Sequence, residues 1–515
     1  MAVAAAFALA LALLLLGLGN STLWSRDETT YAVISRAMLT SGDWVTLHFN
    51  GRPWLNHPPF FFWLMAADFH LLGINEIAAR LPAVVFGAAG VALIVAMGGD
   101  LVGRWGAVAA ALALLLNPLY FVESRMAIID STFLFFLTLT MLAFHRGWLG
   151  DGKAWRLFFV SLGLSCLVKG PWGLVYPMAI IIAFTALGRE TRRLREIPWG
   201  WGMPVALVIG GAWYATQLAL HGAAFAQTVL GYYFIGRITT QVEHQGGPFW
   251  LYLAVLSAGF LPWSPLLPPA LRALWERRAT DARARLIICW LGAPLIGLSL
   301  ASTKLPSYTL LILPPCALAV GGWCARIGER QSLVVPFGLA SAASLCLSAL
   351  VAFKGEAWTA APLPALHAAS AAFLLQGIAL GAAVGAAARP GTSAVPVMLS
   401  ALGAGLFLIT VTMGLLPALE PIRSLREVAM ALRVASRPTD RRAFYGPGVF
   451  GIVFYGDDGP YEELRHEDSL RAWISRGADG VMVTRTDALS HLPAEVRAHL
   501  ETVAQTQRET ILRVR

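Results

Sequence analysis

The chain has 515 residues, of which 57% are hydrophobic and only 13% are charged. Soluble globular proteins carry about 25% charged residues, so this composition excludes an ordinary soluble protein. The formal net charge is +9, but the basic residues are dispersed in short loops, where they act as topology signals. The composition therefore predicts an integral membrane protein with many spans, which contacts membrane lipid and has no nucleic-acid partner.

We place thirteen apolar segments as membrane spans, since a spanning helix takes about 20 residues. They lie at 2–19, 78–99, 106–122, 131–146, 157–168, 172–188, 203–219, 249–271, 286–301, 306–324, 333–352, 366–387 and 394–416. The first segment lacks the basic start and the cleavage site of a signal peptide, so we expect a retained helix. Residues 58–73 are apolar but short and contain Asp68 and His70, and we interpret them as an interfacial helix.

Basic residues mark alternate loops between these segments. The loops hold Arg104, Arg146, Arg193, Arg277, Arg326 and Arg389. The positive-inside rule assigns such loops to the cytoplasm. The N-terminus is then cytoplasmic and, because the number of spans is odd, everything after Pro417 lies outside.

The C-terminal part differs from the rest because it is rich in charged residues. Short β-like runs at 442–446, 451–456 and 480–485 lie between helical stretches such as 422–435. We expect a transmembrane domain at 1–419 and a small extracytoplasmic α/β domain at 420–515.

Several ionisable side chains lie near span ends on the predicted outer side. They are Asp27, Glu28, His57, Arg125, Asp130, Lys169, Arg237, His244 and Lys304. An ionisable group within the hydrocarbon costs about 2.5–3.5 kcal/mol, so it needs a partner, water or a function. Each residue also has a simpler explanation: Asp27 and Glu28 can cap a helix that begins near Thr29, and a lysine can extend to the interface. Their convergence on one side favours a site.

Eight sequence blocks occur in order between residue 21 and about 320. They are RDETTYAVISRAMLTSGDW, NHPPFFFWL, GINEIAARLPAVVFG, SRMAIIDSTFLFF, LVKGPWGLVYP, GPFWLYL, LPWSPLL and STKLPSYTLLILPP. This series resembles the bacterial GT-C glycosyltransferases of the aminoarabinose transferase and protein O-mannosyltransferase group. The resemblance implies an α-helical polytopic membrane protein with the GT-C fold, about 13 transmembrane helices, interfacial helices in the first outer loop and a small C-terminal α/β domain on the outer face.

The resemblance also implies an activity. Such an enzyme moves a sugar from a polyprenyl (undecaprenyl) phosphate to an acceptor on the outer face of the bacterial inner membrane. The acceptor is lipid A, another glycan or a protein. Asn56 and His57 stand where aminoarabinose transferases have Glu-Lys, and Thr30 where they have Arg, so the acceptor stays open. A polytopic transporter or flippase is the alternative, although the chain lacks the paired halves typical of transporters.

Breaking the anomeric C–O bond leaves a phosphate whose growing negative charge is best stabilised by cations. The predicted donor-phosphate and substrate-binding residues are Lys169, Lys304, Arg125, Arg237 and, more weakly, His57, with Tyr31 and Tyr308 as stacking candidates. Histidine is the weaker cation because its ordinary pKa is about 6.5. A divalent cation on Asp27 or Asp130 is a further possibility that the sequence leaves open.

The predicted catalytic residues are Asp27, Asp130 and Glu28. By similarity, Asp27 is the acidic residue of the first outer loop and Asp130 that of the second. A hydroxyl acceptor would need a base, and we assign that role to Asp27, whereas a phosphate acceptor would need none. Direct attack by the acceptor predicts inversion at the anomeric carbon.

Overall fold

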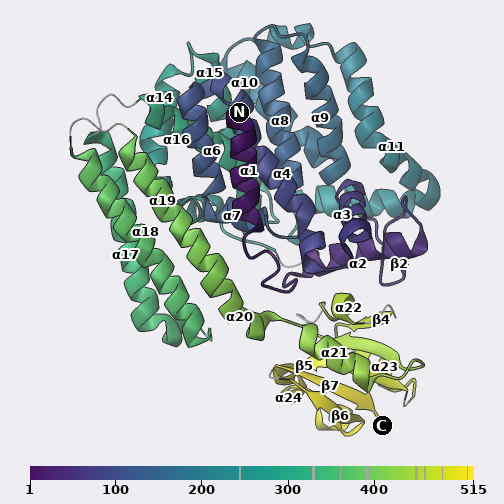
Figure 1. Ribbon diagram of the computed structural model, residues 1–515. Coiled ribbons are helices and arrows are strands. Elements are labelled where there is room, and N and C mark those ends of the chain that lie inside the picture. Colours follow the sequence, from purple (N-terminus) through teal and green to yellow (C-terminus); the bar gives the residue numbers. More distant parts are fainter. Residues whose placement is uncertain are drawn as a thin grey trace. The chain divides into compact units, whose positions relative to one another are not determined.

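The computed structural model (Figure 1) describes residues 1–242, 245–326, 331–359, 361–389, 394–446, 451–456, 460–477, 479–506 and 508–515. The chain divides into two compact units that alternate along the sequence. The first unit comprises Met1–Gly17, Leu55–Phe61 and Pro82–Leu415, and the second comprises Leu18–Trp54, Phe62–Leu81 and Leu416–Arg515. The second unit thus joins the C-terminal residues to two segments from the first hundred residues. The predicted domain limits, 1–419 and 420–515, stay a prediction.

The first unit is helical, and each of the thirteen predicted spans overlaps at least one helix, although some, such as 249–271, cover two. Its longer helices are α1 (Ala2–Leu15), α4 (Glu76–Met97, which starts in the second unit), α6 (Arg104–Leu115), α8 (Asp130–Trp148), α9 (Ala154–Lys169), α10 (Trp172–Leu187), α11 (Trp199–Ala226), α13 (Leu251–Gly259), α14 (Leu267–Arg277), α15 (Ala282–Leu300), α16 (Leu313–Arg326), α17 (Gln331–Trp358), α18 (Leu363–Ala387) and α19 (Val395–Thr410). Seven helices in the described ranges are long and apolar enough to cross a membrane, or eight if α13 and α14, bent by 112°, form one span. The count of thirteen stays a prediction.

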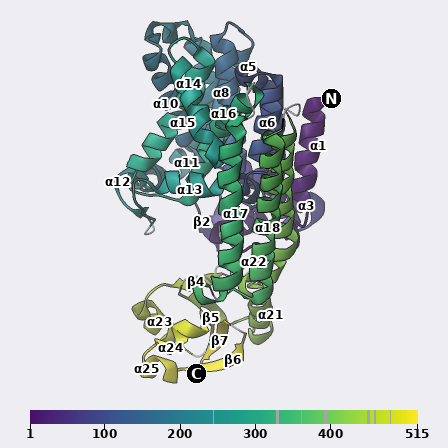
Figure 2. The same cartoon turned by 90° about the vertical axis from the view of Figure 1, so that its left-hand side faces the viewer.

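Close helix contacts in the first unit depend on small residues. Helices α8, α9 and α11 pack in sequence, and α17, α18 and α19 run side by side (Figure 1). Figure 2 shows α17 next to α18 from a second direction. A Cβ atom on Gly163 of α9 would lie 2.8 Å from the carbonyl oxygen of Ala206 in α11, so only glycine permits this approach. The hydroxyls of Thr140 and Ser161 form a buried hydrogen bond of 2.8 Å between α8 and α9. Small and hydroxylated residues at such contacts are typical of helix packing in membranes.

The C-terminal part of the second unit is a five-stranded sheet with the order β4-β3-β5-β7-β6. Its strands are β3 (Arg441–Tyr445), β4 (Tyr461–Leu464), β5 (Gly480–Arg485), β6 (Leu500–Gln505) and β7 (Glu509–Val514). Strand β3 pairs in parallel with β4 and β5, and β7 pairs antiparallel with β5 and β6. Helices α23 (Glu467–Ile474) and α25 (Ala494–Ala498) contribute Trp473 and Val496 to a core with Met482 and Leu512. The predicted α/β domain is confirmed. Its strand at 480–485 lies where predicted, and the strand predicted at 442–446 lies at 441–445.

The predicted strand at 451–456 is wrong, because the chain forms the short helix α22 (Ile452–Tyr455) there. The local sequence is apolar and flanked by glycines, which suits either structure. A distant residue favours the helix: the Arg36 guanidinium donates hydrogen bonds of 2.9 and 3.0 Å to the carbonyls of Val453 and Phe454. Those carbonyls lie near the C-terminal end of α22, where backbone acceptors lack partners within the helix.

The N-terminal segments of the second unit contain α2 (Arg26–Ser41), the strands β1 (His48–Phe49) and β2 (Arg52–Pro53), and most of α3 (Phe60–Leu72). Helix α2 begins three residues before the predicted start near Thr29, because Ser25 is its N-cap and forms a capping box with Glu28. Helix α3 has 13 residues, which is shorter than a membrane span.

Candidate functional site

A narrow pocket of about 40 Å³ lies within the first unit, where several segments of the chain meet. Its lining includes Asn56, His57, Lys169, Trp172, Tyr233, Arg237 and Tyr308. These residues come from the stretch before α3, the α9–α10 turn, the π-helix η2 (Gln227–Gly236), α12 (Arg237–Thr239) and the 3₁₀ helix η5 (Pro306–Ile312). Four predicted site residues, His57, Lys169, Arg237 and Tyr308, therefore line one pocket.

Lys169 and Asp130 form an ion pair beside this pocket. Lys169 is the last residue of α9, Asp130 is the first residue of α8, and Lys169 Nζ lies 2.5 Å from Asp130 Oδ1. Both side chains are mostly buried. The helix ends favour this arrangement, because a helix N-terminus stabilises an anion and a C-terminus a cation. Asp130 therefore pairs with a lysine and does not cap α8, whose N-cap residue is Ile129.

The turn that holds Lys169 depends on Gly170 and Pro171. Gly170 ends α9 with a φ of 70°, which L-residues with a side chain rarely adopt. A Cβ atom there would also lie 2.5 Å from the hydroxyl of Tyr214. Pro171 then precedes the first residue of α10. The LVKGPWG block thus fixes the lysine at a sharp corner between two helices.

Arg237 contacts the same phenol as Lys169. Its guanidinium donates a hydrogen bond to the hydroxyl of Tyr308 and lies 5.4 Å from the ring centroid of Tyr233. Lys169 Nζ lies 5.5 Å from the ring centroid of Tyr308. Two cations thus share one tyrosine at the pocket wall, an arrangement suited to an anionic ligand.

His57 is uncharged in this environment. Burial, followed by the charges of Lys169 and Arg237, lowers the pKa of His57 to about 3. The imidazole is therefore neutral at physiological pH, where it can offer hydrogen bonds and ring contacts, such as that to Tyr233 at 6.0 Å. It does not add a third cation to the pocket.

Lys304 and Arg125 make other contacts. The Lys304 ammonium donates to the carbonyl of Ala301, and the Lys304 backbone N–H donates to the carbonyl of Gln245 at 2.9 Å. Arg125 is buried and donates hydrogen bonds of 2.8 and 2.7 Å to the carbonyls of Leu14 and Leu16 at the end of α1. Neither is among the described residues that line the pocket. Their assignment to the donor phosphate stays a prediction.

Tyr31 lies in an aromatic cluster of the second unit, where its ring centroid is 5.9 Å from that of Trp54 and 5.1 Å from that of Phe62. His244 lies outside the described residues.

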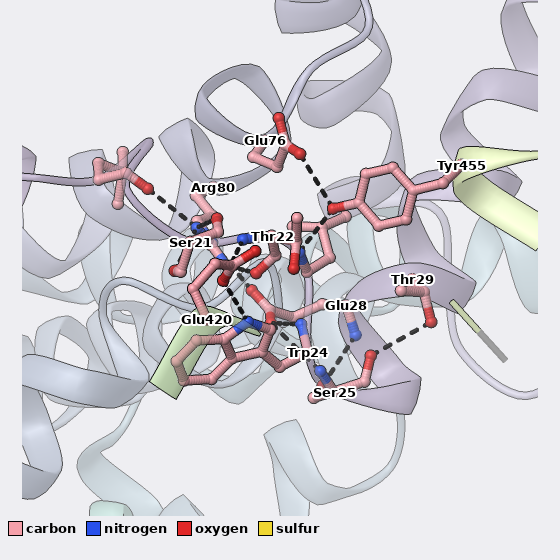
Figure 3. Close-up of polar contacts among 12 residues, drawn as sticks. Ser21, Thr22, Trp24, Ser25, Glu28, Thr29, Glu76, Arg80, Glu420 and Tyr455 are labelled. Atoms are coloured by element: carbon pink, nitrogen blue, oxygen red, sulfur yellow. Dashed lines mark hydrogen bonds and ion pairs between the residues drawn. The ribbon is translucent and has the colours of Figure 1, made fainter. Parts of the chain in front are cut away.

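The second unit contains a buried polar network around Arg80, which sequence reasoning missed (Figure 3). Arg80 Nε donates to Glu28 Oε1 at 3.1 Å. Its other nitrogens donate to the carbonyls of Leu18, Ser21 and Thr22 at 2.9, 2.8 and 2.7 Å. The available signal was an arginine within the apolar segment 78–99, since such a residue needs a partner.

Glu28 therefore has two structural functions. Its carboxylate accepts from Arg80 and from the backbone N–H of Trp24 at 3.3 Å, and its own backbone N–H donates to Ser25 Oγ at 3.1 Å. The side chain is almost fully buried. Asp27, in contrast, is exposed in the first turn of α2. The catalytic roles of both residues stay predictions.

Further contacts of the second unit hold the loop before α2 in place (Figure 3). Glu420 accepts from the backbone N–H of Thr22 at 3.0 Å and from the indole of Trp24 at 2.7 Å. The Tyr455 hydroxyl accepts from the backbone N–H of Leu23 at 2.7 Å and donates to Glu76 at 3.0 Å. The first turn of α2, and with it Asp27, is thus anchored on both sides.

Among the described residues, no group of three or more His, Cys, Asp and Glu side chains gathers in a way that could hold a metal ion. The carboxylate of Asp130 has the Lys169 ammonium as its partner. A carboxylate paired with an ammonium does not fit a resident divalent ion, so Asp130 is not a metal ligand in this arrangement.

Comparison with known proteins supports the sequence resemblance. The family described as "Dolichyl-phosphate-mannose-protein mannosyltransferase" matches residues 56–215. Two proteins named "Undecaprenyl phosphate-alpha-4-amino-4-deoxy-L-arabinose arabinosyl transferase" are similar over much of the chain. The protein from Pseudomonas paraeruginosa is 33% identical over 62% of this chain and 59% of its own length, and that from Edwardsiella ictaluri is 30% identical over 60% and 57%. The chain thus spans less than two thirds of the length of these relatives.

A solved structure extends the comparison. The crystal structure of ArnT from Cupriavidus metallidurans bound to undecaprenyl phosphate superposes with a TM-score of 0.82, over 99% of this chain and 97% of that one, at 21% identity. The chain has the fold of this transferase. The predicted resemblance and fold class are therefore confirmed, and the chain is a multi-pass membrane protein.

Proposed function

We propose that this chain is a membrane glycosyltransferase that moves a sugar from a polyprenyl phosphate to an acceptor on the outer face of the bacterial inner membrane. Its N-terminus would lie in the cytoplasm and its C-terminal domain in the periplasm. The observation that carries the proposal is the pocket in which Lys169 and Arg237 both contact Tyr308. The fold of a transferase bound to undecaprenyl phosphate supports it, and no observation favours the alternative of a transporter.

The pocket suits a phosphate that gains negative charge. As the acceptor oxygen attacks the anomeric carbon, the bond between that carbon and the phosphate oxygen breaks, and polyprenyl phosphate leaves. Lys169 and Arg237 would stabilise the departing phosphate by charge-assisted hydrogen bonds, which are strong where water is scarce. Asp130 would hold the ammonium of Lys169 in position. Attack opposite the leaving phosphate gives inversion.

The fate of the acceptor proton depends on the acceptor. For a hydroxyl, we propose that Asp27 takes the proton, because it is exposed on an anchored turn while the neighbouring Glu28 is held by Arg80. For a phosphate, such as one on lipid A, Asp27 would orient the acceptor. Lipid A, another glycan and a protein all remain candidate acceptors. For a divalent cation, Asp27 is the remaining candidate ligand.

The test compares a deletion strain with the same strain carrying the wild-type chain, Lys169→Met or Asp27→Asn. Mass spectrometry is applied to lipid A, surface glycans and exported proteins. We expect one sugar mass to vanish on deletion, to return with wild type, and to stay absent with both variants at equal membrane levels. Lys354→Met, at an exposed position on α17, is the control and should restore the sugar. If Lys169→Met restores it fully, the pocket is not the donor site.

A further inference from the structure

A second and larger pocket lies entirely within the second unit, with a volume of about 410 Å³. Its lining includes Arg36, Ile74, Glu76, Arg426, Arg433 and Tyr455. They come from α2, the start of α4, α22 and α21 (Arg426–Ala435). None of these residues belongs to the donor pocket described above. A volume of this size is in the range of small-molecule sites.

The polar lining carries excess positive charge. Three arginines and one glutamate are present among its described residues. Glu76 is bound by the Arg426 guanidinium and by the Tyr455 hydroxyl, which Figure 3 shows pointing at the carboxylate. The single acidic charge is therefore already matched by Arg426. Arg36 is held at the pocket by its hydrogen bonds to the carbonyls of α22.

Arg433 is the residue best placed to meet a ligand. It is exposed near the end of α21, and no carboxylate in the described part of the chain forms an ion pair with it. A guanidinium has five donors in a planar fork, which matches the oxygens of a phosphate in a bidentate manner. Arg433 and Arg426 lie seven residues apart on α21, about two helical turns, and so lie on the same face.

One exposed apolar side chain lines this pocket, and a second lies beside two of its lining arginines. Ile74, which lines it, is 47% exposed. Met430 is 59% exposed and lies four residues after Arg426 and three before Arg433, on the same face of α21. Exposed apolar side chains next to arginines suit a ligand that carries both an anionic group and a hydrocarbon chain.

We propose that this pocket binds the phosphate group of an anionic amphiphile. Arg433 is the main phosphate ligand, the remaining donors of Arg426 assist it, and Ile74 and the neighbouring Met430 contact the hydrocarbon chain. The site is separate from the donor pocket. The proposal rests on the second unit alone and does not depend on the glycosyltransferase activity.

The test measures hydrogen–deuterium exchange of the full-length protein in detergent, in peptides covering 70–80 and 426–435. Three probes are compared: lysophosphatidic acid, which has a phosphate and one chain; monoacylglycerol, which has the chain alone; and inorganic phosphate. We expect lysophosphatidic acid to protect both peptides and monoacylglycerol to protect neither. Inorganic phosphate should protect only at much higher concentration. Full protection by inorganic phosphate at the same concentration would contradict an amphiphilic ligand and would indicate a site for free phosphate.

Two variants locate the effect. Arg433→Gln should weaken protection by lysophosphatidic acid about tenfold, the value of one charge-assisted contact. Arg433 has no ion-pair partner to lose in the described chain, so the variant should fold. Arg497→Gln removes the same charge from an exposed position on α25 and should leave protection unchanged. Equal weakening in both variants, or none in Arg433→Gln, would overturn the pocket as the site.

Discussion

The proposed donor pocket of the first unit and the Arg80 network of the second unit use buried cations in opposite ways. Arg80 donates to one carboxylate and three backbone carbonyls within hydrogen-bond distance. Among the described residues, Lys169 has one carboxylate at hydrogen-bond distance and otherwise aromatic rings about 5.5 Å away. The arginine is saturated by the fold, whereas the lysine keeps donors for a ligand. A buried charge alone therefore does not identify a binding site. A buried cation indicates one when some of its donors are not used by the fold.

The largest expected effect is on stability and comes from the saturated cation. Arg80→Met would leave the Glu28 carboxylate buried without its ion-pair partner, and breaking such a pair costs about 3–5 kcal/mol. We expect a loss of that size in the free energy of unfolding of the second unit, measured by native-state hydrogen exchange of its amides. The control Arg52→Met, at an exposed position, should change it by less than about 0.5 kcal/mol. Equal effects of the two substitutions would contradict a specific role for the Arg80 network.

The next effect concerns activity and comes from the unsaturated cation. Lys169→Met should lower kcat about 10²- to 10³-fold, the usual consequence of removing one preorganised donor from a developing charge. The double variant Lys169→Met, Asp130→Asn separates the two roles, since it removes both charges of the pair. It should recover stability lost in the single variant but not activity, as measured by sugar transfer from a polyprenyl phosphate in vitro. Recovery of activity in the double variant would mean that the Lys169–Asp130 ion pair has only a structural role.

The sequence predicted what depends on local patterns. Hydropathy located helices at all thirteen apolar segments, and short β-like runs located the strands at 441–445, to within one residue, and at 480–485. The pattern at 451–456 failed because the contact that favours a helix comes from Arg36, more than 400 residues earlier in the chain. The partner of Glu28 lies 52 residues away, and no spacing rule identifies such a pair.

The candidate site shows the same limit. The motifs placed Lys169, Arg237 and Tyr308 on one side of the membrane, and the structure brings them to one pocket. Arg125 is a cation like Lys169 and Arg237 and was predicted on the same side of the membrane. Its guanidinium nevertheless binds carbonyls at the end of α1. Residue type and side are readable from sequence, whereas the acceptor that each guanidinium meets depends on the tertiary packing.

A smaller effect is expected at the capping box of α2. Ser25→Ala removes the side-chain acceptor for the Glu28 N–H, which costs about 1 kcal/mol at an N-cap. Hydrogen exchange of the first turn of α2 should report that loss, while Ser41→Ala at the exposed end of the helix should have almost no effect. Protection of the first turn unchanged by Ser25→Ala would mean that the Arg80 ion pair and the contacts of the preceding loop hold this turn without the cap. Asp27 would then be positioned by these contacts and not by the cap.

The smallest effect is expected from the ionisation of His57. Its pKa is lowered to about 3, whereas the unfolded chain has the ordinary value near 6.5. Between these values the unfolded state binds more protons, so stability falls as the pH decreases below about 6.5 and is constant above it. Because the side chain keeps some exposure to solvent, we expect a contribution below about 1 kcal/mol at pH 5.5. His57→Gln should flatten the fall in thermal midpoint between pH 6.5 and 5.5, and should leave the shape of the activity profile from pH 7 to 8 unchanged. The contrary result would be a step near pH 6.5 in the activity profile of the wild type that disappears in His57→Gln. It would mean that the imidazole of the folded protein titrates there, and that the pocket gains a third cation in acid.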